Sequence, residues 1–204
     1  MPLHYPQEAH VRRHGPRAYR DYRSFKPWLR DEFDFRCVYC LWRENWCADG
    51  EDSFSVEHML SRVAHPERVC DYDNLLYACC RCNSLKQEDD VPVDPCREGW
   101  AQHVEVGPGG LVEALTSAGA DLIEVCRLNR PLLVNSRRMI MEILELLATN
   151  TSDKARGLRQ HYLAFPENLP DLSNLLPPGG NERPEGIADS YFDRRRRGQL
   201  PESY

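Results

Sequence analysis

The sequence lacks any long apolar run. None of its 204 residues belong to a stretch approaching the ~20 apolar residues that a membrane-spanning helix needs. The first 20 residues also lack the apolar segment of a secretion signal. These absences predict a cytoplasmic protein with no membrane contact.

The cysteine count does not suit a disulfide framework. The chain has nine cysteines, an odd number, and a reducing compartment disfavours disulfides. The 41% hydrophobic and 28% charged residues are typical of a folded globular protein, and no internal repeat is present. Closely spaced cysteines are therefore expected to bind metal.

The net charge of -6 argues against a uniformly basic nucleic-acid-binding protein, but the charge is uneven. Residues 1–30 hold seven basic and two acidic side chains, so this segment carries about +5 and the remainder about -11. Such a segment fits either an arm that binds nucleic-acid phosphates or a solvated, poorly ordered terminus. We assign residues 1–21 to a basic N-terminal arm.

Local patterns predict an α+β fold. Residues 22–33 read as a helix, with Ser24 as its N-cap and Pro27 in its first turn. Short β-like runs follow at 53–58 and 74–79, and a helix begins within 83–87.

A second group of elements is predicted after residue 90. A hairpin is expected at 103–115 about a Gly-Pro-Gly-Gly turn, and the strongest helix pattern lies at 130–149. A further helix is expected at 153–165, before a stretch rich in proline and glycine. The predicted regions are a core at 22–90, an accessory hairpin with helices at 91–165, and a flexible tail at 166–204.

Four cysteines have the spacing of a closed zinc site. Cys37-x-x-Cys40 pairs with Cys79-x-x-Cys82, and two such turns supply a tetrahedral set of four thiolates. The adjacent Cys80 is expected to face away. Because four protein ligands leave no open position, the zinc is predicted to be structural rather than catalytic.

Polar residues surround this zinc site in a fixed order. Glu57-His58 ends the first β-like run, Asn74 opens the second, and Asn83 follows the last zinc cysteine. With the cysteine pairs, this order resembles the HNH endonuclease family, whose fold is the ββα-metal motif. The resemblance covers about residues 36–87, and it implies a metal-dependent nuclease that hydrolyses phosphodiester bonds in DNA.

The resemblance implies a role for each of three side chains. His58 would be the general base that takes a proton from the attacking water, and a neutral imidazole suits that step near pH 7. Glu57 and Asn83 would bind the catalytic cation. An all-oxygen ligand set favours Mg²⁺ or Mn²⁺ over Zn²⁺ at this position.

Three more side chains receive expected roles from the same resemblance. Asn74 would orient His58 without touching the substrate, and Lys86 or Arg81 would contact the phosphate. The sequence departs from the common pattern in that Glu57 stands where an aspartate is usual, so its carboxylate reaches about one methylene further. In addition, Asn83 stands where many members have a histidine ligand.

A second, weaker likeness concerns partners. Residues 21–40 and 128–138 resemble bacterial HNH proteins of anti-phage systems, including the Septu type that is paired with an ATPase. That likeness implies a defence role and a partner ATPase. Two alternatives remain open from the residues alone: a non-catalytic zinc module that binds nucleic acid or protein, and an HNH nuclease that acts on RNA.

Overall fold

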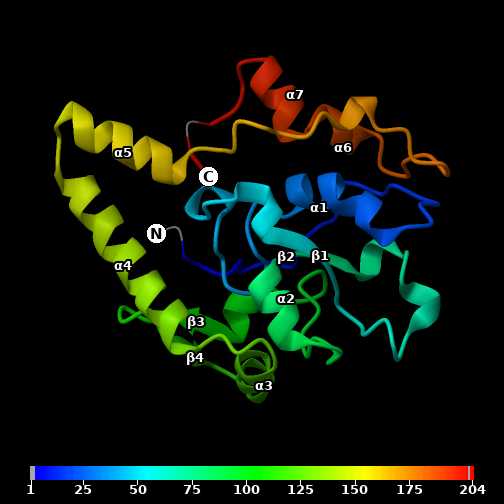
Figure 1. Cartoon of the computed structure of the whole chain (residues 1–204), viewed down its shortest axis with the longest axis horizontal. Coiled ribbons are helices and arrows are strands. Elements are labelled where there is room, and N and C mark those ends of the chain that lie inside the picture. Colours follow the sequence, from blue (N-terminus) through cyan, green and yellow to red (C-terminus); the bar gives the residue numbers. More distant parts are fainter. Residues whose placement is uncertain (1–2, 202) are drawn as a thin grey trace.

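The structure is a computed structural model that describes residues 3–201 and 203–204. Its architecture is α+β, as predicted: seven α-helices and two antiparallel sheets of two strands each occur within the described residues (Figure 1). None of the helices in this part of the chain is long and apolar enough to cross a membrane.

The strands are β1 (Phe54–His58), β2 (Leu75–Cys79), β3 (Val104–Val106) and β4 (Val112–Ala114). The helices are α1 (Lys26–Glu32), α2 (Cys80–Lys86), α3 (Ser117–Val125), α4 (Pro131–Thr149), α5 (Asp153–Leu163), α6 (Glu185–Ala188) and α7 (Tyr191–Arg196). The order strand, strand, helix occurs twice: as β1, β2 and α2 near the centre of the molecule, and as β3, β4 and α3 towards its lower edge in Figure 1.

The central unit consists of β1, β2 and α2. The two strands pair antiparallel with Glu57 opposite Leu76, and every residue of β2 is buried. Helix α2 follows β2 without a loop, because the Cys79 side chain caps it by accepting a hydrogen bond from the Cys82 amide. Both predicted strands are confirmed, and the helix begins at Cys80, before the predicted stretch.

Helix α1 confirms the predicted N-terminal helix with one correction at its start. A 3₁₀ turn, Tyr22–Phe25, precedes the α-helix, and Pro27 lies in the first turn as expected. Ser24 lies within that turn, and Asp21 caps the turn by accepting a hydrogen bond from the Arg23 amide; the N-cap residue of α1 itself is Phe25, which makes no side-chain cap. The buried face of α1 includes Trp28, which is wholly inaccessible to solvent.

Part of the N-terminal segment, predicted to be a basic arm, packs against the rest of the protein. Tyr5 is buried in the main hydrophobic cluster, and its hydroxyl donates to the Tyr39 carbonyl at 2.7 Å. Arg12 donates to the Leu75 carbonyl at 2.6 Å, and Arg13 lies 3.4 Å from Asp31. These two arginines therefore satisfy internal acceptors and are not presented to a phosphate backbone.

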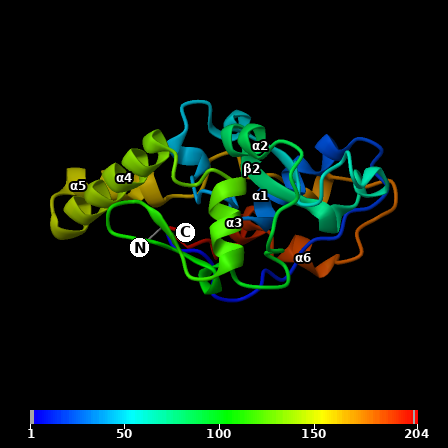
Figure 2. The same ribbon diagram turned by 90° about the horizontal axis from the view of Figure 1, so that it is seen from below.

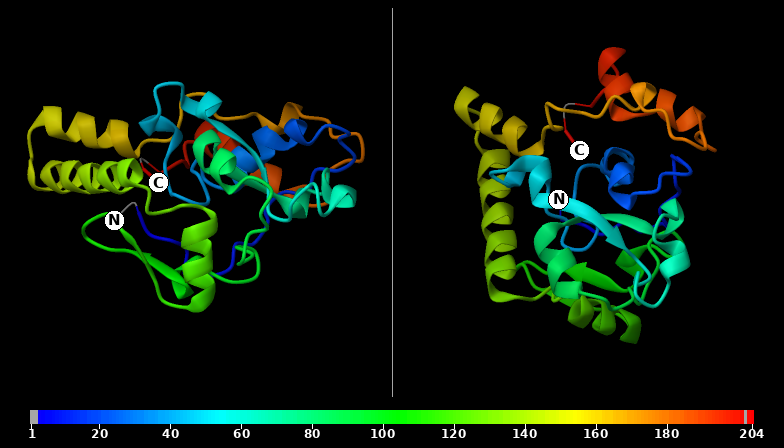
Figure 3. Two further views of the ribbon diagram at one scale, coloured as in Figure 1. Left: turned by 60° about the horizontal axis from the view of Figure 1, so that its bottom comes forward. Right: turned by 45° about the vertical axis from the view of Figure 1, so that its right-hand side comes forward.

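The segment 166–204 also differs from its expectation as a flexible tail. It runs along one side of α1 and contains α6 and α7 (Figure 3). Phe165 and Leu169 form a hydrophobic cluster with the fully buried Phe35, and the Tyr191 amide donates to Asp31 at 2.8 Å. A high proline and glycine content here reflects an irregular path over the surface rather than a lack of contacts.

The accessory elements largely match the sequence pattern. The β3–β4 hairpin and α4 are confirmed, and Ile140 and Leu144 are buried as the apolar stripe of α4 requires. Helix α3 was not predicted; the Thr116 side chain caps it by accepting from the Gly119 amide. Helices α4 and α5 lie at one end of the molecule (Figure 2), and they diverge from the turn that joins them (Figure 1).

Candidate functional site

A pocket of about 230 Å³ lies between the end of β1 and helix α2. Glu57 and His58 line it from β1, while Asn83 and Lys86 line it from α2. Alternation would send Glu57 and His58 to opposite faces of a continuing strand. Because β1 ends at His58, both residues reach the same pocket.

Glu57 forms a buried ion pair with Lys86. The Lys86 Nζ atom lies 3.0 Å from Glu57 Oε1, and the side chains are 1% and 3% exposed. Burial raises the pKa of Glu57 to about 7, against the positive charge of Lys86, which lowers it. Lys86 also donates to the Asp89 carbonyl, so its ammonium group is held inside the protein. It is not free to make the phosphate contact that the sequence suggested.

His58 is held in one tautomer. Its Nε2 donates to the Val69 carbonyl at 3.0 Å, which leaves Nδ1 as the ring nitrogen with a lone pair. Burial lowers the pKa of His58, and the positive charges of Arg62 and Lys86 act in the same direction. A neutral imidazole is therefore favoured near pH 7.

Asn74 holds the loop that carries the carbonyl partner of His58. Its Oδ1 accepts from the Leu60 amide at 2.9 Å, and its Nδ2 donates to the carbonyls of Leu60 and Arg68 at 3.1 and 3.3 Å. Asn74 is completely buried and does not line the pocket. This placement suits an orienting residue.

The side-chain amide of Asn83 is fixed through its nitrogen. Its Nδ2 donates to the Ser55 hydroxyl at 2.9 Å and to the Val56 carbonyl at 3.1 Å. Oδ1 accepts no hydrogen bond from the residues that the structure describes. An amide fixed by its nitrogen in this way offers its oxygen to a cation.

Arg81 lies elsewhere. It lines a different pocket, of about 460 Å³, beside Cys40, Cys79 and Arg130. The helical periodicity of α2 explains the separation, since Arg81 is two residues from Asn83 and the two side chains point to different faces. The structure therefore does not bring Arg81 to the His58 pocket.

Arg62 and Tyr22 are among the pocket residues that the sequence did not indicate. Arg62 is 50% exposed at the pocket, within 3.4 Å of the Tyr22 hydroxyl and 3.5 Å of Glu88. The Tyr22 ring stands edge-on to His58 with ring centroids 4.8 Å apart. Neither residue carries a sequence signal: Arg62 lies in a loop without a period, and Tyr22 reads as part of a helix.

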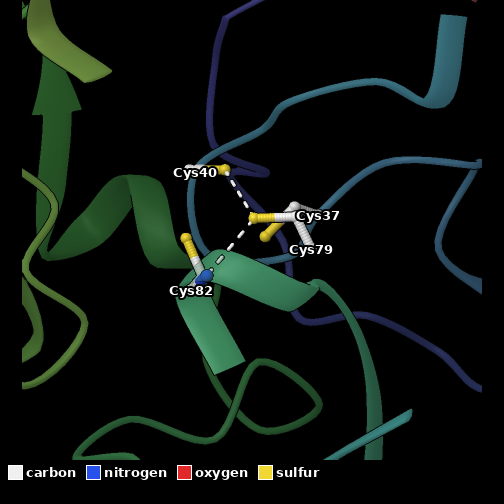
Figure 4. A group of neighbouring side chains, drawn as sticks. All are labelled: Cys37, Cys40, Cys79 and Cys82. Carbon is white, nitrogen blue, oxygen red and sulfur yellow. Dashed lines mark hydrogen bonds between the residues drawn. The ribbon is translucent and has the colours of Figure 1, made fainter. Parts of the chain in front are cut away.

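The four predicted zinc cysteines form a compact, buried cluster (Figure 4). Their Sγ atoms all lie within 4.8 Å of one another, and Cys40 and Cys79 are 3.8 Å apart. Zinc–sulfur bonds of about 2.3 Å in a tetrahedron separate the sulfurs by about 3.8 Å. The cluster can therefore hold a structural metal such as zinc.

The remaining cysteines stand apart from this cluster. Cys80 is exposed, which matches the expectation that it faces away from its neighbours Cys79 and Cys82. Among the residues placed by the structure, no second group of three or more His, Cys, Asp or Glu ligand atoms converges as these four do.

Comparison with protein-family models gives no match for this chain, and comparison with curated proteins gives none either.

Proposed function

We propose that the chain is a metal-dependent endonuclease of the HNH type that hydrolyses phosphodiester bonds in DNA. The observation that supports this most strongly is the meeting of Glu57, His58 and Asn83 at one pocket. They come from a strand end and a helix, 26 positions apart at most, in the order that the HNH resemblance assigns to a cation ligand, a base and a second ligand. Two of the four clustered cysteines belong to the same unit, since Cys79 ends β2 and Cys82 lies in α2.

His58 is the general base in this proposal. The Val69 carbonyl occupies Nε2, so Nδ1 takes the proton from the attacking water. The lowered pKa keeps the ring unprotonated and ready near pH 7. Asn74 acts through the loop and orients the ring without contacting substrate.

Glu57 and Asn83 are the residues that would hold the catalytic cation. Mg²⁺ typically uses one or two protein oxygens and fills its other positions with water and substrate phosphates. The Glu57 carboxylate and the Asn83 Oδ1 fit that requirement, and Mn²⁺ accepts the same ligands. When bound, such a cation supplies Lewis-acid polarisation of the scissile phosphate and stabilises charge on the leaving 3′ oxygen.

Arg62 takes the phosphate-contact role that the sequence assigned to Lys86 or Arg81. Its guanidinium is half-exposed at the pocket, whereas Lys86 is buried against Glu57 and Arg81 faces another pocket. A guanidinium fork suits a phosphate, because its donors match the oxygen geometry. Lys86 instead fixes the Glu57 carboxylate from inside the protein.

The test is cleavage of supercoiled plasmid by the full zinc-loaded chain in Mg²⁺, in Mn²⁺ and in EDTA. We expect nicked or linear product only with a divalent cation, and a loss of at least about 100-fold in His58→Ala with zinc content unchanged. His161→Ala, an exposed site on α5, is the matched control and should cut normally. Equal cutting by wild type and His58→Ala would reject the proposal.

The same assay separates the alternatives. Faster digestion of RNA than of DNA would assign an RNA substrate to the same residues. Binding of DNA without hydrolysis under any divalent cation would favour a non-catalytic zinc module. The partner ATPase and the anti-phage role stay predictions from the sequence.

A further inference from the structure

The zinc cluster receives a hydrogen bond from a distant part of the chain. Arg130 Nη2 donates to Cys82 Sγ at 3.3 Å, across 48 residues of sequence. Arg130 is the N-cap residue of α4, and it is partly buried beside Cys40 and Cys79. A cation from the accessory region thus contacts a cysteine of the zinc site.

The backbone of a nearby residue, Arg127, also holds the guanidinium of Arg130 in place. Its second arm, Nη1, donates to the Arg127 carbonyl at 3.2 Å. The segment 127–130 is held on one side by Asn129, whose side chain accepts from the Val112 amide and donates to the Val112 carbonyl, both at 2.8 Å. Arg137 clamps the other side by donating to the Leu128 carbonyl at 2.8 Å.

The charge of the site explains why a cation belongs there. Four thiolates around one Zn²⁺ leave a net charge of about -2, and Cys82 is fully buried. Uncompensated charge in the protein interior is costly, and a hydrogen bond from a charged donor is stronger than one from a neutral donor. Partners that hydrogen-bond to metal ligands typically change metal affinity by about 10- to 100-fold.

We infer that Arg130 is a working part of the zinc centre: its fixed guanidinium compensates the Cys82 thiolate, slows zinc loss, and makes metal retention depend on the segment joining α3 to α4. This role does not depend on the proposed nuclease activity. The accessory region is then linked to the core by the hydrogen bond from Arg130 to Cys82 as well as by packing.

The first test measures the rate at which the full zinc-loaded chain transfers zinc to a colorimetric chelator. Arg130→Met keeps most of the apolar stem and removes the charged donor. Arg138→Met is the matched control, because Arg138 is an exposed residue of α4 whose side chain pairs only loosely with Glu142, at 3.9 Å. We expect transfer about 10-fold faster or more in Arg130→Met and unchanged in Arg138→Met. Wild-type transfer by Arg130→Met, or equal acceleration in both variants, would overturn the inference.

A second measurement decides the matter if Arg130→Met does not fold. Co²⁺ is substituted for zinc in wild type and in Arg130→Lys. The lysine keeps the positive charge but loses the guanidinium that bonds Cys82 Sγ and the Arg127 carbonyl together. A hydrogen bond lowers the energy of the sulfur lone pairs, so its loss should move the sulfur-to-cobalt charge-transfer band to longer wavelength. An unmoved band in Arg130→Lys, with zinc transfer at the wild-type rate, would also overturn the inference.

Discussion

The Lys86 ammonium group lies 3.0 Å from the Glu57 carboxylate, and the two side chains are among the most deeply buried charged groups of the protein. Glu57 is the penultimate residue of β1, and Lys86 is the last residue of α2. The ion pair therefore ties the end of the strand to the end of the helix at the floor of the His58 pocket. It also sets the charge at the place where the proposed cation would bind.

Breaking this pair from one side should destabilise the fold strongly. Lys86→Met leaves Glu57 buried without its counter-charge, and we expect a loss of about 3–5 kcal/mol in the free energy of unfolding by urea. The double variant Glu57→Gln/Lys86→Met should regain much of that loss, because no charge is then left unpaired. Arg138→Met, which removes an exposed pair, should cost under about 1 kcal/mol. A Lys86→Met protein as stable as wild type would show that the pair does not form.

The zinc ligands can be told apart from their neighbour by substitution. Cys79→Ser should abolish zinc binding and unfold the β1–β2–α2 unit, because structural zinc contributes folding free energy directly. Cys80→Ser, at the adjacent exposed residue, should retain one zinc per chain and a normal circular dichroism spectrum. Zinc content is measured by elemental analysis of the purified proteins. Loss of zinc in Cys80→Ser together with retention in Cys79→Ser would reverse the assignment.

The lowered pKa of Glu32 should make the free energy of unfolding depend on pH in the acid range. Burial would raise its pKa, but the hydrogen bond from His10 and the positive charges of His10, His14 and Arg12 together lower it to about 2 from the ordinary 4.5. The folded protein therefore binds this proton more weakly than the unfolded chain does. The stabilisation that Glu32 contributes is fully present above about pH 4.5 and is lost as the pH falls towards 2.

The corresponding variant is Glu32→Gln. Its stability difference from wild type, measured by urea unfolding, should shrink on acidification by about 3 kcal/mol over that pH range. The carboxylate also accepts from the His14 amide and the Tyr72 hydroxyl, both at 3.0 Å, so the loss at pH 7 should be large. A difference that is the same at pH 3 and pH 7 would contradict the lowered pKa.

Asn74 should behave as a positioning residue. Asn74→Ala removes three hydrogen bonds that hold the loop from Leu60 to Arg68, and with them the fixed position of the Val69 carbonyl. We expect kcat for plasmid cleavage to fall by more than tenfold while KM changes little, since Asn74 does not line the pocket. Asn45→Ala is the control, because it loses a side-chain hydrogen bond to the Ala164 carbonyl away from the pocket. An equal fall in both variants would indicate a general stability effect.

Local patterns were sufficient for the elements that carry their own signal. Helix α4 has an apolar stripe over many turns, and β2 is a short buried run, so both were predicted from periodicity and composition. The choice of Cys79 and Cys82 over Cys80 followed from ligand spacing alone, and the buried cluster agrees with it. These features depend on neighbours close in sequence.

Features that depend on distant partners could not be predicted in the same way. Nothing near Arg12 indicates that it donates to the Leu75 carbonyl, and nothing near Phe35 indicates that Phe165 packs against it. The HNH resemblance assigned Glu57 to binding the cation and Lys86 to contacting the phosphate, and it did not indicate that the two side chains form an ion pair. Arg62 lines the pocket because of the path of its loop, and that loop has no hydrophobic periodicity from which its path could be predicted.

In the proposed function, Glu57 and Asn83 converge on one labile cation beside His58. The most direct measurement is Mn²⁺ binding to the zinc-loaded chain, followed by electron paramagnetic resonance, in wild type, Glu57→Gln and Asn83→Ala. The exposed Glu145→Gln on α4 is the control. We expect one Mn²⁺ per wild-type chain, at least tenfold weaker binding in both pocket variants, and no change in the control. Unaltered Mn²⁺ affinity in Glu57→Gln and Asn83→Ala would contradict it.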